Sequence, residues 1–325
     1  MSARLFFALM LLFAMPCARA AEFAGIPVFI DEMVAKHQFN REDMVRLFQR
    51  AQRRQSIIDA ISAPATRKPW PEYRANFINS RRVNGGLQFW QQYRDALQRA
   101  EKQYGVPQEI IVALIGVETS YGRNAGKYST LDALTTLAFD YPRRADFFRS
   151  ELEQYLLLAR EQEFDLLKVQ GSYAGALGIP QFMPGSYRRY AVDFSGDGRV
   201  DLLHDPLDAI GSVANYMNKY GWINGEPVTV PASAGVDYYA ARPPLAKRNA
   251  MEWAMSGIKP EQPTDPDRTS RLIDFTVDDG KEYWLAFGNF DVIRRYNNSD
   301  YYAMSVFQLA EALREARNEK IADVR

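Results

Sequence analysis

The stretch VPQEIIVALIGVETSYGR, residues 106–123, decides the fold of this chain and points to its chemistry. Residues 110–115 form an apolar run of the kind that a helix buried on all sides needs. The run leads to a single carboxylate, Glu118. Burial at the end of such a helix would raise the pKa of Glu118, and a carboxylic acid that stays protonated near neutral pH can act as a general acid. The alternative is a last turn that reaches the surface and leaves Glu118 solvated.

Composition narrows the functional classes. The chain has 325 residues, 47% of them apolar and 25% charged, enough for one large domain or a few small ones. A net charge of zero gives no indication of a nucleic-acid partner. The chain has only two histidines, His37 and His204, and no HExxH, GxSxG, Walker or Rossmann motif. These absences argue against histidine-based metal hydrolysis, a Ser-His-Asp triad and nucleotide binding, and leave carboxylate chemistry on an uncharged polymer.

The N-terminus has the pattern of a secretory signal peptide at residues 1–20. Arg4 is followed by an apolar run, residues 5–15, that is too short to span a bilayer, and then by Ala18-Arg19-Ala20, a small-x-small cleavage pattern. We expect a mature chain that begins near Ala21, lies in the periplasm and has no transmembrane segment. An N-terminal core helix is the alternative.

The only cysteine, Cys17, lies inside this segment and raises the alternative of a lipid anchor. The preceding Ala14-Met15-Pro16 matches poorly the small residue expected before a lipidated cysteine, so we favour simple secretion. The mature protein would then have no thiol, which excludes disulfides, thiol catalysis and cysteine-ligated zinc.

Apolar periodicity and cap residues predict a mostly helical N-terminal half. We expect a helix over residues 41–54 with Asn40 as its N-cap, and another over residues 87–104 that ends at Gly105. Pro107 suits the first position of the Glu118 helix. Ser129 or Thr130 would cap a helix through residue 140, and residues 143–162 have the apolar spacing of a further helix.

Two loops carry unusual residues. Residues 171–184, GSYAGALGIPQFMP, contain three glycines that allow close backbone approach, although a tight connection between packed helices would use them too. Residues 193–201, DFSGDGRVD, place side-chain oxygens at alternate positions and a glycine sixth, as in a calcium loop. The twelfth position is His204 and not the usual glutamate, so Asp205 or Asp208 would have to close the shell. A metal-free Asx-turn is the alternative.

The sequence pattern changes from helical to strand-like at residues 228–292. Residues 228–230, 271–276 and 282–287 are predicted strands, and Asp278-Asp279-Gly280 is a hairpin turn. Residues 296–302, YNNSDYY, then precede a closing helix over residues 303–319. Their clustered tyrosine and asparagine side chains offer stacking surfaces with polar tips, or simply a helix-entry turn.

These blocks together resemble the lytic murein transglycosylase B family. The matching segments are IGVETSYGR at 115–123, YPRR at 141–144, QGSYAGALGIPQFMPGSY at 170–187, DFSGDGRVDLLHDPLDAIGSVANY at 193–216 and RYNNSDYY at 295–302. The resemblance implies an α+β, predominantly helical protein. In it, a helical flanking domain (21–104) precedes a lysozyme-like catalytic core (105–227). A small β domain (228–292) follows, and the chain then returns to the core with a closing helix (293–325).

The resemblance also implies a reaction. The family cleaves the β-1,4 bond between N-acetylmuramic acid and N-acetylglucosamine in peptidoglycan and leaves 1,6-anhydromuramic ends, so it acts as a lyase. A single glutamate serves as acid and then as base, with help from the sugar's own 2-acetamido group. We expect glycan strands as the partner, other cell-wall enzymes as further candidates, a monomer, and no organic cofactor.

Site residues follow from the same resemblance, position by position. Glu118 is the expected catalytic residue. The expected substrate-binding residues are Arg143, Arg144, Ser172, Gln181, Tyr216, Tyr296, Asn297 and Tyr302. The expected ligands of a structural Ca²⁺ or Na⁺ in the 193–208 loop are Asp193, Ser195, Asp197, Arg199 through its carbonyl, and Asp208, with Asp205 as the rival for the last place.

Three other readings stay open. A hydrolytic muramidase of the same fold would release reducing ends with water as the acceptor. A non-catalytic peptidoglycan-binding protein would need the cleft but not Glu118, and the intact VETSYG context argues against it. A cation-sensing helical protein is motivated only by the 193–208 loop.

Overall fold

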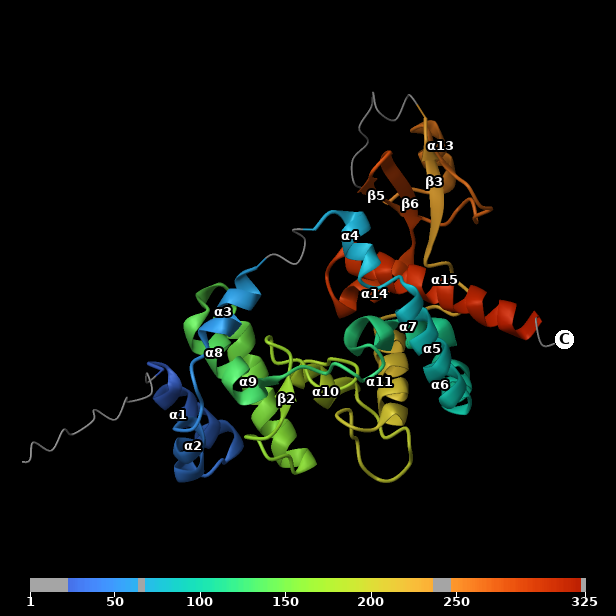
Figure 1. Ribbon diagram of the computed structural model, residues 1–325. Helices are drawn as coiled ribbons and strands as arrows, with labels where there is room; N and C mark the ends of the chain where they lie inside the picture. Colours follow the sequence, from blue (N-terminus) through green and yellow to red (C-terminus); the bar gives the residue numbers. More distant parts are fainter. Residues whose placement is uncertain (1–22, 64–67, 236–246, 323–325) are drawn as a thin grey trace, which may run out of the picture. The chain divides into compact units, whose positions relative to one another are not determined.

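The computed structural model describes residues 23–63, 68–235 and 247–322 (Figure 1). The predicted signal peptide, its cleavage site and Cys17 lie outside these residues. The chain divides into two compact units, the first ending at Arg53 and the second beginning at Arg54. No helix in the described ranges is long and apolar enough to cross a membrane.

The first unit contains α1 (Ile26–His37) and α2 (Arg41–Phe48). The Asn40 side chain accepts a hydrogen bond from the Asp43 N–H at 3.0 Å, which confirms the predicted N-cap. The helix was expected to continue to residue 54 but ends at Phe48. Beyond it, the amides of Arg50 and Ala51 bond to carbonyls three residues back, so the chain tightens into turns.

The second unit is built around α7 (Gln108–Thr119), the helix that carries Glu118. Its residues 110–117 are all buried, because α5 (Ser80–Gln92), α6 (Arg94–Tyr104), α11 (Pro206–Lys219) and α15 (Asp300–Ala322) all pack against it. This packing explains a helix that is apolar all round. The single helix predicted over residues 87–104 is wrong, since α5 and α6 meet at Tyr93, where the backbone leaves the helical region. Gly105 ends α6 at φ +74°, as predicted.

Other helices complete the unit. They are α3 (Gln55–Ser62), α4 (Trp70–Ala75), α8 (Thr130–Asp140), the short 3₁₀ helix η2 (Pro142–Arg144), α9 (Ala145–Gln162), α10 (Pro184–Tyr190), α13 (Ala250–Met255) and α14 (Gly288–Tyr296). Ser129 caps α8 and Asp205 caps α11, as the sequence predicts. α9 starts at Ala145 and not at residue 143, because η2 precedes it. The sequence did not predict α14, whose residues follow the last strand directly.

A small antiparallel sheet lies apart from the helical core of this unit (Figure 1). Its strands are β3 (Thr229–Ala234), β4 (Ile258–Pro260), β5 (Arg271–Val277) and β6 (Gly280–Ala286), in the order β4-β3-β6-β5. Val277 pairs with Gly280, which confirms the hairpin predicted at Asp278-Asp279-Gly280, although Gly280 already belongs to β6. Trp253 of α13 fills the core of one face together with Leu285 and Phe287. β4 was not predicted, because its three residues are too few to form a recognisable strand pattern.

A second, two-stranded pairing joins β1 (Tyr128–Ser129) to β2 (Gln170–Gly171), at the start of the glycine-rich loop. The expectation of an α+β, predominantly helical protein is confirmed. The finer division into four parts after the signal stays a prediction.

Gly178 shows why the loop at residues 171–184 needs glycine. Its φ is +70°, and a Cβ there would lie 2.1 Å from the Leu202 carbonyl oxygen. That carbonyl accepts the Ile179 N–H at 2.8 Å, so the loop runs directly against the chain after the cation loop. Gly178 therefore has the close-packing role given above as the alternative. Its packing holds the glycine-rich loop in place.

We predict that Gly178→Ala destabilises the protein well beyond a matched glycine. Gly225, at φ +76° with no atom near its missing Cβ, is the control. Alanine at either position strains the backbone by about 1–2 kcal/mol, and the clash at residue 178 adds about 1–3 kcal/mol. Urea unfolding of both variants measures the difference. Equal destabilisation would show that the contact with Leu202 relaxes freely.

Candidate active site

The end of α7 is turned back sharply just after Glu118. Ser120, Tyr121 and Gly122 all have left-handed φ values, +55°, +66° and +81°. The Thr119 hydroxyl donates to the Ile179 carbonyl at 2.8 Å and accepts from the Gly122 N–H at 2.9 Å. This side chain therefore holds both the reversed turn and the glycine-rich loop against the helix end.

The ring of Tyr121 is wedged between helices. A Cβ on Gly85, Gly86 or Gly116 would come within 3.1 Å of a Tyr121 atom, so only glycine leaves room for the ring. Its hydroxyl donates to the Arg82 carbonyl at 2.9 Å, and the Arg82 guanidinium donates to the Gly116 carbonyl. Two consecutive left-handed non-glycine residues cost free energy, and this packing offsets that cost.

Glu118 sits partly buried at this point. The Tyr302 hydroxyl, from the first turn of α15, donates a hydrogen bond to its Oε1 atom. Burial raises the pKa of Glu118 from its ordinary 4.5 to about 7, while the bond from Tyr302 acts in the opposite direction. The rise predicted from the apolar helix is confirmed, so Glu118 exchanges a proton near neutral pH.

Tyrosines gather around this carboxyl. Tyr296 stacks nearly parallel to Tyr302, with ring centroids 6.5 Å apart, and its hydroxyl donates to the Pro180 carbonyl at 2.5 Å. Tyr216 lies 4.8 Å from Tyr296, and its hydroxyl donates to the Arg295 carbonyl at 2.8 Å. Burial first, and then the charge of Glu118, raises the pKa of both Tyr296 and Tyr302. Two of the predicted residues, Tyr296 and Tyr302, therefore lie beside Glu118 and stay neutral, and Tyr216 packs against Tyr296.

Tyr73 of α4 belongs to the same cluster and was missed by the sequence analysis. Its pKa is raised by burial and then by the charge of Glu118. It packs on Tyr301 at 5.4 Å and on Phe77 at 5.3 Å. No local pattern links Tyr73 to Glu118, because the two meet only through the tertiary fold.

Ser172 and Gln181 brace the glycine-rich loop. The Ser172 hydroxyl accepts from the amides of Ala174 and Ala176 at 3.2 and 3.0 Å. Gln181 has φ +53°, and its amide nitrogen donates to the carbonyls of Ala125 and Gly178 at 3.0 and 2.9 Å. Their predicted contact with substrate stays a prediction, and the loop they support reaches Thr119 and Tyr296 through its carbonyls.

The remaining predicted substrate residues are exposed. The Arg144 guanidinium lies over the rings of Phe147 and Phe148, at 4.3 and 5.2 Å. Arg143 is exposed in the same 3₁₀ turn, and Asn297 is exposed with its carbonyl accepting from the Ser299 N–H at 2.7 Å. The structure does not join these three side chains to Glu118.

The 193–208 loop is closed by Asp208. Its buried carboxylate accepts from the amides of Phe194, Ser195 and Asp201 at 2.7, 3.0 and 2.7 Å. Asp205 instead caps α11 by accepting the Leu207 N–H at 2.7 Å. Of the two rivals, only Asp208 thus bonds to the loop backbone.

Asp193 opens the loop. Its carboxylate accepts from the amides of Gly196 and Gly198 at 2.6 and 2.8 Å, and these bonds lower its pKa. The predicted ligands Asp193, Ser195, Asp197, Arg199 through its carbonyl and Asp208 would all coordinate through oxygen atoms, which suits a hard cation such as calcium. Within the described ranges, however, no group of three or more acidic or imidazole side chains converges as a metal site. The chemistry of the predicted ligands fits calcium, and their arrangement here serves the loop backbone.

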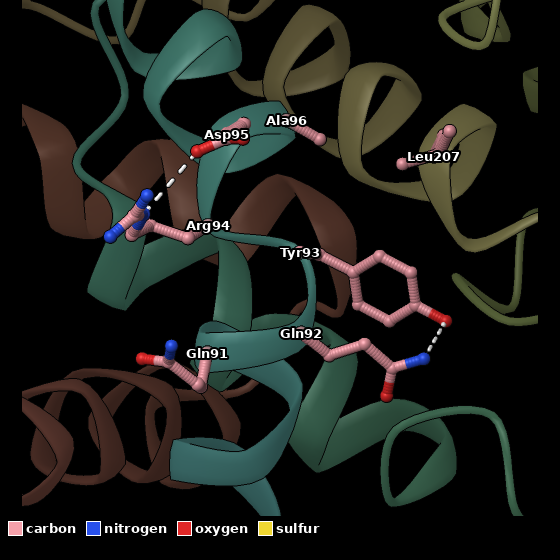
Figure 2. Close-up of a pocket in the computed structure, with 7 residues that line it drawn as sticks. All are labelled: Gln91, Gln92, Tyr93, Arg94, Asp95, Ala96 and Leu207. Carbon is pink, nitrogen blue, oxygen red and sulfur yellow. Dashed lines mark hydrogen bonds and ion pairs between the residues drawn. The ribbon is translucent and has the colours of Figure 1, made fainter.

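Two pockets lie outside this cluster. One, of about 600 Å³, is lined by residues that include Trp222, Trp284 and Glu311. Figure 2 shows a smaller one, of about 260 Å³, where the α5–α6 junction at Tyr93 faces Leu207 of α11. Neither is lined by Glu118, so the tyrosine cluster is a separate feature.

Comparisons with known proteins identify the family of this chain. A profile described as "Transglycosylase SLT domain" matches residues 24–311. The chain belongs to this transglycosylase family. Membrane-bound lytic murein transglycosylase B of Escherichia coli (strain K12) is 46% identical over 304 residues, which cover 89% of this chain and 82% of that protein.

Solved structures extend the match to the fold. Escherichia coli lytic transglycosylase Slt35 in complex with calcium is 45% identical with a TM-score of 0.85, covering 91% of this chain and 95% of that one. SltB3 from Pseudomonas aeruginosa in complex with NAG-anhNAM-pentapeptide is 29% identical with a TM-score of 0.79, covering 89% and 78%. The expected lysozyme-like fold and the identification as a lytic transglycosylase are confirmed.

We predict that Glu118→Gln stabilises the protein at alkaline but not acidic pH. At about pH 4 Glu118 is protonated in both the folded and unfolded states. Between about pH 4.5 and 7 the unfolded state has released the Glu118 proton while the folded state still holds it, so the free energy of unfolding falls across this range. Above about pH 7 it stays at the lower value. The rise in pKa from 4.5 to about 7 corresponds to at most ~3 kcal/mol.

Urea unfolding at pH 4 and pH 8 tests this expectation. Glu163→Gln, which removes an exposed carboxylate at the end of α9, is the control. A Glu118→Gln variant with the same relative stability at both pH values would contradict the raised pKa.

Proposed function

We propose that this lytic transglycosylase cleaves the β-1,4 bond between N-acetylmuramic acid and N-acetylglucosamine in peptidoglycan, with Glu118 as acid and then base. The observation that carries the proposal is a partly buried carboxyl with a pKa near 7, hydrogen-bonded by Tyr302 and flanked by neutral tyrosines. A group that must give and then take a proton works best when its pKa lies near the working pH.

The first step is protonation of the leaving group. Protonated Glu118 gives its proton to the glycosidic oxygen as the bond from C1 to that oxygen breaks. The 2-acetamido group of the muramic acid supports the positive charge that develops at C1, which is the substrate-assisted route that needs no second carboxylate. The partial burial of Glu118 favours this step, because the acid is still protonated near neutral pH.

The second step closes the ring. Glu118, now a carboxylate, takes the proton of the C6 hydroxyl while that oxygen bonds to C1, and the product is a 1,6-anhydro sugar. No water is consumed and Glu118 ends protonated, ready for another cycle. The SltB3 complex with an anhydro-muramyl ligand supports this product, since that protein shares the fold.

Tyr302 supports the charged half of the cycle. Its hydroxyl donates to Oε1 and so stabilises the carboxylate after the first proton transfer. Its own pKa is raised by burial, so it stays a donor throughout. We assign Tyr73, Tyr216, Tyr296 and Asn297 to the walls of the sugar site, with Ser172 and Gln181 as polar contacts.

Arg143 and Arg144 would meet the carboxylates of the lactyl group or the stem peptide. Both are exposed on η2, where a polymer could contact them. We further propose that the enzyme works in the periplasm, as a monomer, on glycan strands.

For the 193–208 loop we propose a structural calcium held by Asp193, Ser195, Asp197, the Arg199 carbonyl and Asp208. The Slt35 structure with calcium motivates the choice of ion. Calcium would tie together the chain that Asp208 already closes, and its role is stability rather than catalysis.

Glu118→Gln is expected to lower the turnover of purified sacculi by a factor on the order of 10²–10⁴. Glu109→Gln, at the opposite end of the same helix, is the control and should leave turnover unchanged. Mass spectrometry of the released fragments identifies the sugar ends. Anhydro ends, lighter by one water, are expected; reducing ends would establish the hydrolytic muramidase, and full activity of Glu118→Gln would refute the assignment of Glu118.

Calcium is expected to raise the melting temperature of the wild type but not that of Asp193→Asn. At a concentration of about 100 times the dissociation constant the ion adds ~2.7 kcal/mol. Asp278→Asn, in the β5–β6 turn, is the control. An equal calcium effect in the wild type and Asp193→Asn would place the ion elsewhere.

A further inference from the structure

Tyr302 can reach Glu118 only if the first turn of α15 is held in place. The helix begins at Asp300, after the exposed residues Asn297 and Asn298 and the half-buried Ser299. Ser299 accepts the Tyr302 N–H with its hydroxyl at 3.4 Å and the Ala303 N–H with its carbonyl at 3.1 Å, so these bonds shape the turn locally. Its orientation toward Glu118 depends in addition on the groups that bind Asp300 and Tyr301.

Asp300 is bound by the small sheet. The two terminal nitrogens of Arg271, the first residue of β5, donate to its two carboxylate oxygens at 3.0 and 2.8 Å. Arg294 of α14 approaches the same carboxylate at 2.9 Å and donates to the Asn298 side chain at 2.8 Å. The Arg271–Asp300 pair is bidentate and its side chains are only 19% and 34% exposed, so it has geometry that an exposed pair lacks.

A second carboxylate extends the cluster. The Asp291 carboxylate of α14 forms an ion pair with the Lys247 ammonium at 2.8 Å. Its oxygens also lie 3.8 Å from a guanidinium nitrogen of Arg271 and 4.0 Å from one of Arg294. Three cations therefore share two carboxylates across β5, α14 and α15. Removing one partner would leave the others without compensation in a partly desolvated site.

The opposite side of the turn is held by aromatic packing. Tyr301 lies 5.1 Å from Trp70 and 5.7 Å from Phe275 of β5, and Trp70 stacks on Phe275 at 4.4 Å. The Trp70 indole donates to Glu282 of β6 at 2.5 Å. The sheet thus contacts two consecutive residues, Asp300 through an ion pair and Tyr301 through aromatic packing. Both residues directly precede Tyr302.

We propose that Arg271 and Asp300 are positioning residues, which orient the Tyr302 hydroxyl toward Glu118 and so make the small sheet part of the catalytic apparatus. The inference rests on the proposed function of Glu118. It assigns the sheet a role in proton transfer through its contacts with α4 and α15.

Displacement of Tyr302 should change the pKa of Glu118. The tyrosines that face Glu118 are Tyr73 from α4, Tyr296 from α14 and Tyr302 from α15. From the α5 side, Arg82 binds the Gly116 carbonyl, and Arg123 acts on Tyr121. Among these groups Tyr302 is the one that lowers the pKa of Glu118, so displacing Tyr302 raises that pKa.

The experiment compares Arg271→Met and Asp300→Asn with Tyr302→Phe in the full chain. A displacement of about 1 Å can cost on the order of 100-fold in rate, so kcat/KM should fall about 10- to 100-fold. The alkaline limb of the pH profile, which reports loss of the Glu118 proton, should move to higher pH in all three variants. Adding Arg271→Met to Tyr302→Phe should move the limb no further.

Arg268→Met is the matched control. Arg268 is 28% exposed and pairs with Glu226 at 3.3 Å and Asp265 at 3.7 Å, away from α15. It should leave the pH limb where it is. Should Arg271→Met not fold, Asp300→Asn, which keeps the side-chain shape, provides the same readouts.

Two outcomes separate the levels of inference. If Tyr302→Phe moves the limb and neither Arg271→Met nor Asp300→Asn does, the pair is merely structural and the inference is overturned. If Tyr302→Phe leaves the limb in place and Glu118→Gln stays active, the assignment of Glu118 itself fails.

Discussion

The desolvation of Glu118 at the end of α7 is the constraint on which this structure depends. α7 is buried because four helices pack on it, and its last turn carries the carboxyl into a shell of tyrosines. A nearby cation would lower the pKa of Glu118 and make it a poor acid at neutral pH. The shell instead supplies a neutral hydroxyl from Tyr302, which helps the carboxylate without forcing it to stay charged.

The chain reverses direction immediately after Glu118, at the end of α7. Three left-handed residues produce that reversal, and they are stable only because Tyr121 fits a slot that glycines line on two helices. Thr119 then joins the turn to the glycine-rich loop. The glycines that line the Tyr121 slot and those of the 171–184 loop have the same role. They let backbone segments approach closely where a side chain would displace Glu118.

Local features of this protein could be predicted from the sequence and non-local ones could not. The apolar run of α7, the caps Asn40, Ser129 and Asp205, and the hairpin at Gly280 each depend on a few neighbouring residues. The break at Tyr93 has no such signal. Among the candidate site residues, Glu118 and the tyrosines of the 296–302 segment could be proposed from motifs, whereas Tyr73 lies on a six-residue helix that is linked to Glu118 by tertiary packing.

The small sheet shows the same limit: strands can be predicted locally, but the contacts that they make with distant residues cannot. Three of its four strands could be predicted, but not the contact at one end of β5, where Arg271 binds Asp300. Alternation along β5 puts Arg271 on the same face as the buried Ile273 and Phe275. Its place at the start of the strand brings its guanidinium to Asp291 of α14 and Asp300 of α15. A bidentate pair at that place is directional, whereas apolar packing tolerates small rotations. Orientation of a hydroxyl toward an acid needs the directional kind of contact, which is why a charge cluster rather than a larger core stands at this junction.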